Sequence, residues 1–365
     1  MPSKLIGCAL SLLLLHLVGV RIAVVAHAVQ HHAAASGELE GAFQAYKFRH
    51  LREYANDDAE HQAFLAFKDN VASARRLQSM NPHASFGDSP FMDMPASTFR
   101  RRYLTDGIKR PRPPKPSTGV ALDSSRPLPR FHPARGDRGG IEPGNPAKWD
   151  WRPYGVVTPV KNQGDCGSCW AFSTTGNIEG QWKLARGALV SLSEQDLVSC
   201  CLLSFGCNGG DPDLAIIWAE LLEKGRIATE ESYPYVSGHH GVVPKCRLDD
   251  PNITWGATVD GFHDIPGNET IMAQQMWARG PISVPVNATA FQTYTGGIMS
   301  DCDGSWLPDH VVLIVGYDDT FQPPYWIIKN SWGAHWGESG YLRLAKGTDQ
   351  CDITFFPSTA DVPES

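Results

Sequence analysis

The sequence lacks the features of nucleic-acid-binding, metal-dependent and membrane-embedded proteins. Its formal net charge is −7, and it has no basic stripe of the kind that binds nucleic acid. It contains no His-Glu-x-x-His zinc motif and no glycine-rich phosphate loop. Internal repeats are absent, and only one apolar run, near the N-terminus, approaches the length needed to cross a bilayer. We therefore expect no metal, no cofactor and no nucleic-acid partner.

What is present begins with a leader. Residues 1–28 combine an early positive charge at Lys4, an apolar run over 10–20 and a small-x-small cleavage site at 26–28. This pattern predicts a secretory signal peptide. Arg21 interrupts the apolar stretch and disfavours a membrane span, with a retained signal anchor as the alternative. The secretory route implies a secreted protein or one of a lysosome-like compartment.

The rest of the chain has the composition of a globular protein, with 42% hydrophobic and 10% aromatic residues. Its charge is unevenly distributed. Residues 30–144 hold 17 Lys and Arg against 13 Asp and Glu, whereas residues 145–365 hold 13 against 26. A basic segment followed by an acidic one suggests that the first docks on the second, with chance as the alternative.

Cysteines and glycosylation sequons fit an exported chain. Asn252, Asn268 and Asn287 each begin an Asn-x-Thr triplet and are candidate surface glycosylation sites. Of nine cysteines, Cys8 lies in the leader, and the others indicate disulfides with room for a free thiol. These others are Cys166, Cys169, Cys200, Cys201, Cys207, Cys246, Cys302 and Cys351.

Three regions that differ in composition and residue spacing follow the leader. Residues 38–80 place aromatic residues at helical spacing, which predicts two amphipathic helices. Residues 105–144 are rich in Pro, Gly and Arg and predict an extended, protease-accessible linker. From residue 145 the pattern predicts helices first and strands afterwards. The expected helices cover 168–186, a short segment from 193, and 213–224; the expected strands cover 281–286, 311–317, 325–328 and 341–344.

The helix expected at 168–186 has clear ends. Ser168 can cap its start, and Gly187 stands where the helix would stop. Gly176 and Gly180 lie on one face and would let another element pack closely.

Cys169 falls in the first turn of this helix, where the helix dipole favours a thiolate. A nearby imidazolium favours the thiolate more, and Cys–His pairs can lower the thiol pKa to roughly 3–4. Cys169 is therefore a candidate nucleophile, with a half-cystine as the alternative.

Four motifs, in order along the chain, resemble those of the papain family of cysteine peptidases, to which the cathepsins also belong. They are the nucleophile segment Cys-Gly-Ser-Cys-Trp-Ala-Phe at 166–172, the groove wall Gly-Cys-Asn-Gly-Gly at 206–210, the histidine segment Asp-His-Val at 309–311 and the asparagine segment Lys-Asn-Ser-Trp-Gly at 329–333. The resemblance covers about 145–351. Within the family, residues 81–87 and 177–182 are similar to the cathepsin L-like, cruzipain-like enzymes of kinetoplastid parasites.

The resemblance implies a role for each site residue. Cys169 would attack the scissile carbonyl, His310 would exchange protons with it and with the leaving amine, and Asn330 would orient the imidazole. Gln163 and the backbone N–H of Cys169 would hold the oxyanion. Other residues would line the substrate groove and the specificity pocket: Gly209, Gly210, Asp211, Pro212, Pro285, Asp309, Trp332 and Phe356.

Two of these residues bear on specificity. Phe356, at the pocket floor, would favour modest apolar side chains. Asp211 would recruit a basic side chain at the rim or simply be solvated.

The implied fold is α+β and papain-like, with a helical left domain, an antiparallel β-barrel-like right domain and a helical N-terminal propeptide. The expected boundaries are a signal peptide at 1–28, an inhibitory propeptide and linker at 29–144, and the peptidase at 145–365. Within the peptidase, the helical half would span about 152–260 and the β half about 261–352. The basic propeptide would dock at neutral pH and leave in acid, giving a zymogen.

The resemblance also implies disulfides and partners. The pairs would be Cys166–Cys207, Cys200–Cys246 and Cys302–Cys351. Cys201 would be free and buried, or would compete with Cys200 for Cys246. The expected partners of a monomeric enzyme are protein and peptide substrates, its own propeptide and cystatin-like inhibitors.

Two other functions compete with an endopeptidase. The pair His239-His240 lies where cathepsin B has an occluding loop, which would indicate an exopeptidase, but the segment 235–246 is short and has no extra cysteine pair. A non-enzymatic binder would have lost a catalytic residue, yet all four positions are filled. We therefore expect a cysteine endopeptidase that works through an acyl-enzyme.

Overall fold

The computed structural model describes residues 37–105, 145–302 and 307–363. The expected leader at 1–28 and all but the first residue of the expected linker at 105–144 lie outside the described residues. The chain divides into two compact units, one ending at Lys68 and the other beginning at Asp69, and each is described by itself. Within the described ranges, no helix combines the length and the apolar character that a membrane span requires.

The first unit is helical and is held together by aromatic packing. Residues 37–49 form one helix, and helix α2 (Asp57–Met80) begins in this unit, which confirms the two expected helices. The ring centroid of Phe43 lies 5.4 Å from those of Phe64 and Phe67. Tilted aromatic pairs of this kind add to the stability that burial itself provides.

In the second unit, Asn70 fixes the chain that follows α2. Its Nδ2 donates hydrogen bonds to the carbonyls of Met92 (2.9 Å) and Met94 (2.8 Å). The elements of this stretch are strand β1 (Ala84–Phe86) and helix α3 (Ala96–Tyr103). Neither was predicted, because each is too short to show a period.

Helix α4 (Cys169–Arg186) is the central helix of the second unit. Ser168 is its N-cap residue and Gly187 its left-handed C-cap (φ 79°), which confirms the expected ends. The expected capping chemistry is wrong, because the Ser168 hydroxyl caps no N–H and lies 2.7 Å from the Tyr235 hydroxyl. The other elements of this half are α5 (Glu194–Cys200), α6 (Pro212–Glu223), β3 (Arg226–Ala228) and β4 (Trp255–Thr258).

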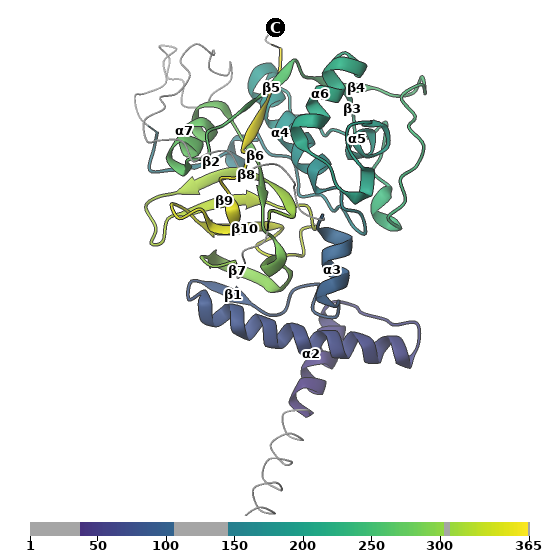
Figure 1. Cartoon of the computed structure of the whole chain (residues 1–365), viewed down its shortest axis with the longest axis vertical. Helices are drawn as coiled ribbons and strands as arrows, with labels where there is room; N and C mark the ends of the chain where they lie inside the picture. Colours follow the sequence, from purple (N-terminus) through teal and green to yellow (C-terminus); the bar gives the residue numbers. More distant parts are fainter. Residues whose placement is uncertain (1–36, 106–144, 303–306, 364–365) are drawn as a thin grey trace, which may run out of the picture. The chain divides into compact units, whose positions relative to one another are not determined.

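The other half is a sheet whose strand order is β1-β7-β10-β9-β8-β6-β11-β5, with β2 paired to β8. Its strands pair antiparallel except β7 and β10. The strands are β2 (Lys148–Asp150), β5 (Gly261–Asp264), β6 (Ile282–Val286), β7 (Tyr294–Met299), β8 (His310–Asp318), β9 (Tyr325–Lys329), β10 (Tyr341–Ala345) and β11 (Ser358–Asp361). The four expected strands are confirmed as β6, β8, β9 and β10, whereas helix α7 (Glu269–Arg279) was not predicted. Figure 1 shows the helices α4, α5 and α6 in teal and the central strands of the sheet in green to yellow.

The two halves meet along α4 and β8. Ser173 Oγ donates to the carbonyl of Val312 at 2.9 Å and lies 2.6 Å from Ser283 Oγ. A Cβ on Gly176 would lie 3.2 Å from a methyl carbon of Leu313. The glycine face of α4 therefore packs closely against the sheet, as expected, and both α4 and β8 are almost entirely buried.

Asp196 is a buried carboxylic acid in α5 (0% exposed). Its Oδ2 accepts a hydrogen bond from the Ala228 N–H at 2.8 Å, while Oδ1 has no hydrogen-bond partner among the described residues. Burial raises the pKa of this carboxyl from 3.8 to about 7. Between these two values the folded chain binds a proton that the unfolded chain does not, so stability falls as the pH rises through this range.

We expect Asp196→Asn to match the parent in stability near pH 4 and to exceed it above pH 7, where only the parent buries a charge. The difference should reach a few kcal/mol, at about 1.4 kcal/mol for each pKa unit. Thermal unfolding between pH 4 and pH 8 measures it, with the exposed Asp260→Asn as control. A difference in stability between Asp196→Asn and the parent that is the same at every pH would contradict this expectation.

Candidate active site

Cys169 stands at the N-terminal tip of α4 as a free, fully buried thiol (0% exposed). The loop before it is clamped by the disulfide between Cys166 and Cys207. The backbone of Val311 hydrogen-bonds to the thiol, so the sulfur lies next to the residue that follows His310. The junction of α4 and β8 thus brings together the two residues predicted to react.

His310 opens β8 and is oriented by Asn330. The imidazole Nε2 lies 2.8 Å from Asn330 Oδ1, and the Ser331 N–H donates to the same Oδ1, also at 2.8 Å. Because this oxygen can only accept, Nε2 carries the hydrogen and Nδ1 is the basic nitrogen. Nδ1 has no hydrogen-bond partner among the described residues. The Trp332 indole covers the pair, 4.7 Å from the imidazole between centroids.

Burial disfavours the charged form of both members of the Cys–His pair in this state of the chain. Burial raises the pKa of the Cys169 thiol to about 12, although hydrogen bonds from the backbone of Val311 and Trp170 oppose the rise. Burial also lowers the pKa of His310 to about 4, against the hydrogen bond to Asn330. Burial therefore opposes both charges of the expected thiolate–imidazolium pair while the site is covered, and the resting ion pair stays a prediction.

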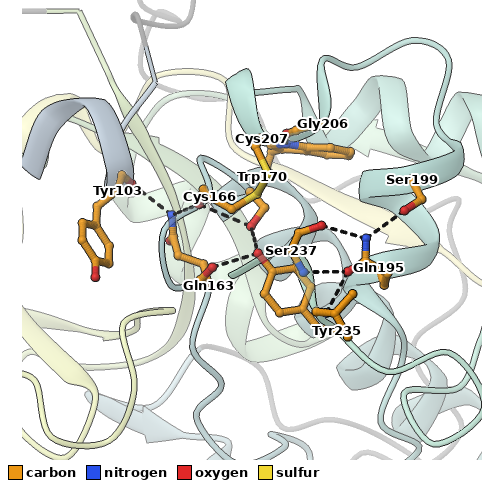
Figure 2. Close-up of a disulfide and its surroundings, with 12 residues drawn as sticks. Tyr103, Gln163, Cys166, Trp170, Gln195, Ser199, Gly206, Cys207, Tyr235 and Ser237 are labelled. Carbon is orange, nitrogen blue, oxygen red and sulfur yellow. Dashed lines mark hydrogen bonds between the residues drawn. A yellow bond between two sulfur atoms is a disulfide. The ribbon is translucent and has the colours of Figure 1, made fainter. Parts of the chain in front are cut away.

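Gln163 is buried with its amide held in one orientation. Its Oε1 accepts hydrogen bonds from Ser331 Oγ (2.7 Å) and Trp332 Nε1 (3.1 Å). Nε2 therefore faces the other way and donates to the carbonyls of Cys166 (2.8 Å) and Tyr103 (3.1 Å), as Figure 2 shows. The donor that the resemblance assigns to the oxyanion is thus occupied by a backbone carbonyl of α3.

The segment that leads out of α3 continues along the expected groove wall. Gly209 has φ +108°, and a Cβ there would lie 3.1 Å from Thr105 Cγ2. The Thr105 N–H donates to the carbonyl of Asp309 at 2.7 Å. A Cβ on Gly210 would lie 2.5 Å from the Trp170 ring, so no side chain fits there. The groove wall therefore presents only backbone, at Gly209 and Gly210, where residues 103–105 cross the site.

Asp211 does not lie free at the pocket rim. It is the N-cap of α6, and its Oδ1 accepts hydrogen bonds from the N–H groups of Asp213 (2.9 Å) and Leu214 (3.4 Å). The expectation of a simply solvated carboxylate is wrong, because the helix start uses it. Pro212 follows as the first helical residue, where its missing N–H has no consequence.

Pro285 and Phe356 come from neighbouring strands. Pro285 is buried in β6, and Phe356 is half-buried with φ +45°, just before β11. Ser358 of β11 pairs with Ser283 of β6, and Phe356 lies two residues before this pair, in a bend outside the strand. The two expected pocket residues thus belong to segments of the chain that meet where β6 pairs with β11.

The Asp309 side chain is turned into the protein. Its Oδ1 accepts a hydrogen bond from the Ala288 N–H (2.8 Å), and Oδ2 accepts one from Thr289 Oγ1 (3.1 Å). Burial raises its pKa, and these hydrogen bonds oppose the rise. Asp309 therefore contacts residues 103–105, the segment that crosses the site, through its backbone carbonyl and not through its carboxylate.

Three disulfides link Cys166 to Cys207, Cys200 to Cys246 and Cys302 to Cys351, which is the pairing that the resemblance implies. Among the described cysteines, Cys169 and Cys201 are free, and both are buried. Within the same ranges, no group of three or more His, Cys, Asp or Glu residues could hold a metal ion.

One of the three sequons is incompatible with the fold. Asn287 is 1% exposed, and its Oδ1 accepts a hydrogen bond from the Thr289 N–H, so the expectation of a surface glycan there is wrong. Asn252 is exposed. Asn268 is half-buried and caps α7 through its Oδ1.

The sequence analysis missed three residues that hold Gln163. Ser331 orients its amide, Tyr103 accepts from it, and the Tyr235 hydroxyl donates to its backbone carbonyl at 2.8 Å. Ser331 lies inside the asparagine motif, which was a usable signal. Tyr103 and Tyr235 lie far from every motif in the sequence, and nothing in their local pattern pointed to the site.

Comparisons with known proteins agree with this geometry. The family model described as "Papain family cysteine protease" matches residues 145–360. A cysteine proteinase of Trypanosoma brucei brucei is 44% identical over 324 residues, covering 89% of this chain and 67% of the relative. Cysteine proteinase A of Leishmania mexicana is 43% identical over 321 residues, covering 88% and 85%.

Solved structures give the same result. The structure of a recombinant stem bromelain precursor superposes with a TM-score of 0.71 at 29% identity, covering 90% of this chain and all of that one. The structure of digestive procathepsin L 3 of Tenebrio molitor gives 0.69 at 32%, covering 89% and 99%.

In the intact chain, we expect Cys169 to react slowly with iodoacetamide between pH 5 and pH 8. The thiolate is the reactive species, and a buried thiol with a pKa of about 12 forms almost none of it in this range. Mass spectrometry of the peptide that contains Cys169 follows the reaction, and Cys169→Ser reports the labelling of Cys201. Rapid alkylation of Cys169 at pH 5 would overturn the assignment of a neutral pair.

Proposed function

The chain belongs to the papain family of cysteine proteases, and we propose that it is an endopeptidase made as an autoinhibited precursor. One observation carries the proposal: the buried Cys169 thiol contacts the backbone of Val311, the residue that follows His310, and Asn330 orients the His310 imidazole. Gln163 adds an amide donor with a fixed orientation. A nucleophile, a base, an orienting group and an oxyanion donor are the parts that acyl transfer requires.

The proposed reaction has two halves. In the first, His310 Nδ1 takes the proton of Cys169, the sulfur attacks the scissile carbonyl carbon, and Gln163 Nε2 with the Cys169 N–H holds the oxyanion. The C–N bond then breaks, the leaving amine takes the proton from His310, and a thioester remains. In the second half, water gives a proton to His310 and attacks the thioester, and the C–S bond breaks to release the acid and restore the thiol.

We assign residues 29–144 as the inhibitory propeptide, on the contacts of its described part. Phe91, Phe99 and Tyr103 pack around Trp332, with ring centroids 5.7, 5.1 and 6.1 Å from the indole. Phe99 is fully buried. The Tyr103 carbonyl occupies the Gln163 amide, so a substrate carbonyl cannot reach that donor while the segment is in place.

Acid would weaken this inhibition. Arg102 Nη1 lies 3.4 Å from Asp165 Oδ2. Burial raises the pKa of Asp309, and the charge of Arg100 opposes the rise. The Arg102–Asp165 pair is partly exposed, and such pairs contribute about 1 kcal/mol or less, so the aromatic contacts supply most of the affinity and the charges supply the pH dependence. Protonation of the carboxylates removes the attraction to the arginines.

The substrate preference, the cellular location and the partners of the enzyme are also proposed, each on a single feature of the chain. The half-buried Phe356, just before the strand that pairs with β6, supports a shallow pocket for modest apolar side chains. The use of Asp211 as a helix cap weakens the case for recruitment of a basic side chain there. Three disulfides support the secretory route and a lysosome-like or extracellular site of action. Monomeric action and inhibition by cystatin-like proteins follow from the family.

Cys169→Ser should abolish peptide hydrolysis by the acid-treated precursor while leaving its thermal unfolding unchanged, because the hydroxyl is a far weaker nucleophile than a thiolate. Release of a fluorogenic group from a blocked internal peptide measures the activity. Cys201→Ser, which changes the other free buried cysteine of the described chain, should keep full activity. Hydrolysis by the Cys169→Ser protein would exclude Cys169 as the nucleophile.

Phe99→Ala should weaken self-inhibition, because it removes a fully buried ring from the cluster around Trp332. Losses of this type cost about 3–5 kcal/mol in a protein core. We therefore expect the pH at which the precursor becomes active to rise. Phe48→Ala is the matched control, since Phe48 is 84% exposed. An unchanged activation pH in Phe99→Ala would argue against the inhibitory role of α3.

A further inference from the structure

The Tyr235 hydroxyl connects the two residues that frame the oxyanion site. It donates to the Gln163 carbonyl at 2.8 Å, as Figure 2 shows. It also lies 2.7 Å from Ser168 Oγ. Gln163 carries the proposed amide donor. Ser168 directly precedes Cys169, whose N–H is the second proposed donor. One phenol therefore contacts the chain at both donors, although it lies on a separate loop.

The donor and acceptor roles of these groups are fixed. A backbone carbonyl can only accept, so the single phenol hydrogen goes to Gln163 and the Ser168 hydroxyl donates to the phenol oxygen. The alternative acceptor for Ser168, the carbonyl of Cys166, is farther away at 3.5 Å. Burial raises the pKa of Tyr235, so the phenol keeps its hydrogen throughout the acid and neutral range.

The loop that carries Tyr235 is held in place independently. Gln195 Oε1 accepts hydrogen bonds from the N–H groups of Val236 (2.8 Å) and Ser237 (3.0 Å), and its Nε2 donates to Ser237 Oγ at 2.9 Å (Figure 2). The Tyr235 ring meets Phe172 edge-on, 4.9 Å between centroids. The phenol oxygen is thus presented by a ring and a loop that do not depend on its own hydrogen bonds.

The same loop follows the Gln163 segment closely. The Asp165 N–H donates to the carbonyl of Gly238 at 2.8 Å. A Cβ on Gly238 would lie 2.6 Å from the Gln163 carbonyl oxygen, so the two backbones touch. Removing only the phenol hydroxyl would therefore leave the loop in position and free the Gln163 carbonyl from its hydroxyl donor.

We propose that Tyr235 is a positioning residue that fixes the spacing between the two oxyanion donors, the Gln163 amide and the Cys169 N–H. The inference rests on the proposed function, because it concerns the same acyl-transfer site. No described contact joins the phenol to the imidazole of His310. Its loss should act on the oxyanion, which forms only in the transition state, and should leave the intrinsic reactivity of the thiol unchanged.

The test compares Tyr235→Phe with Tyr233→Phe in the acid-activated full-length protein. Tyr233 is the matched control, because its hydroxyl is buried and has no hydrogen-bond partner among the described residues. Active sites are counted with a peptide epoxide before kinetics. We expect Tyr235→Phe to lower kcat roughly tenfold with little change in KM, the effect of one lost hydrogen bond on the transition state. Tyr233→Phe should behave as the parent.

Two inhibitors separate positioning from general damage. A peptide aldehyde forms a hemithioacetal whose oxygen lies where the oxyanion forms, so it should bind Tyr235→Phe roughly tenfold more weakly. Iodoacetamide forms no oxyanion, so its rate against pH should be unchanged. Ser168→Ala, which removes the other contact of the phenol, should shift the same readouts in the same direction.

The outcomes are distinguishable. If the parent is active and Tyr235→Phe matches Tyr233→Phe in kcat and aldehyde affinity, the positioning role is wrong and the proposed function stands. A fall in alkylation rate as large as the fall in kcat would mean that Tyr235 only supports the fold. A parent that hydrolyses no peptide after acid treatment would instead overturn the proposed function.

Discussion

The packing of α4 against β8 is the constraint on which the site depends. Cys169 and His310 belong to different halves of the second unit, and neither half contains a reactive pair by itself. The hydrogen bond from Ser173 to Val312 and the close approach at Gly176 fix how α4 runs along the strand. A shift of a single turn along this contact would carry the thiol several ångströms from the imidazole, since each residue of a helix advances by about 1.5 Å.

Buried charge at the same junction adds to this constraint. Lys161 Nζ contacts carboxylate oxygens of Glu179 (3.1 Å) and Glu194 (2.6 Å), which belong to α4 and α5. Lys329 of β9 precedes Asn330; burial lowers its pKa to about 8, against the charge of Glu179. Buried ion pairs add little net stability, but separating one leaves an uncompensated charge that costs several kcal/mol. The attraction between Lys329 and Glu179 crosses from the sheet to α4, so the cluster opposes separation of the halves there and helps to hold the residue that precedes Asn330.

The sequence was sufficient where a property is local and insufficient where it depends on tertiary surroundings. The ends of α4 and the four central strands followed from glycine positions and apolar runs, and the motifs located Cys169, His310 and Asn330. A triplet cannot reveal that Asn287 is enclosed. Asp211 followed by Pro212 ahead of an apolar run is a helix-start signal, so its capping role could have been predicted. The charge state of the pair depends on what covers it, which no motif encodes.

The state with residues 103–105 over the site and the state that reacts with substrate favour different charges on Cys169 and His310. Burial in the first favours the neutral groups, whereas reaction requires a thiolate. A helix N-terminus favours a nearby anion by about 0.3–1 kcal/mol at an exposed site, far less than the burial that raises the pKa of Cys169 to about 12. The helix dipole cannot generate the thiolate while residues 103–105 lie over it. The proposed propeptide thus blocks the site, because its Tyr103 carbonyl occupies the Gln163 amide, and burial disfavours the charged form of both reacting groups while it is in place. If departure of the segment lets water reach both groups, the change that admits a substrate is also the change that permits the ion pair to form.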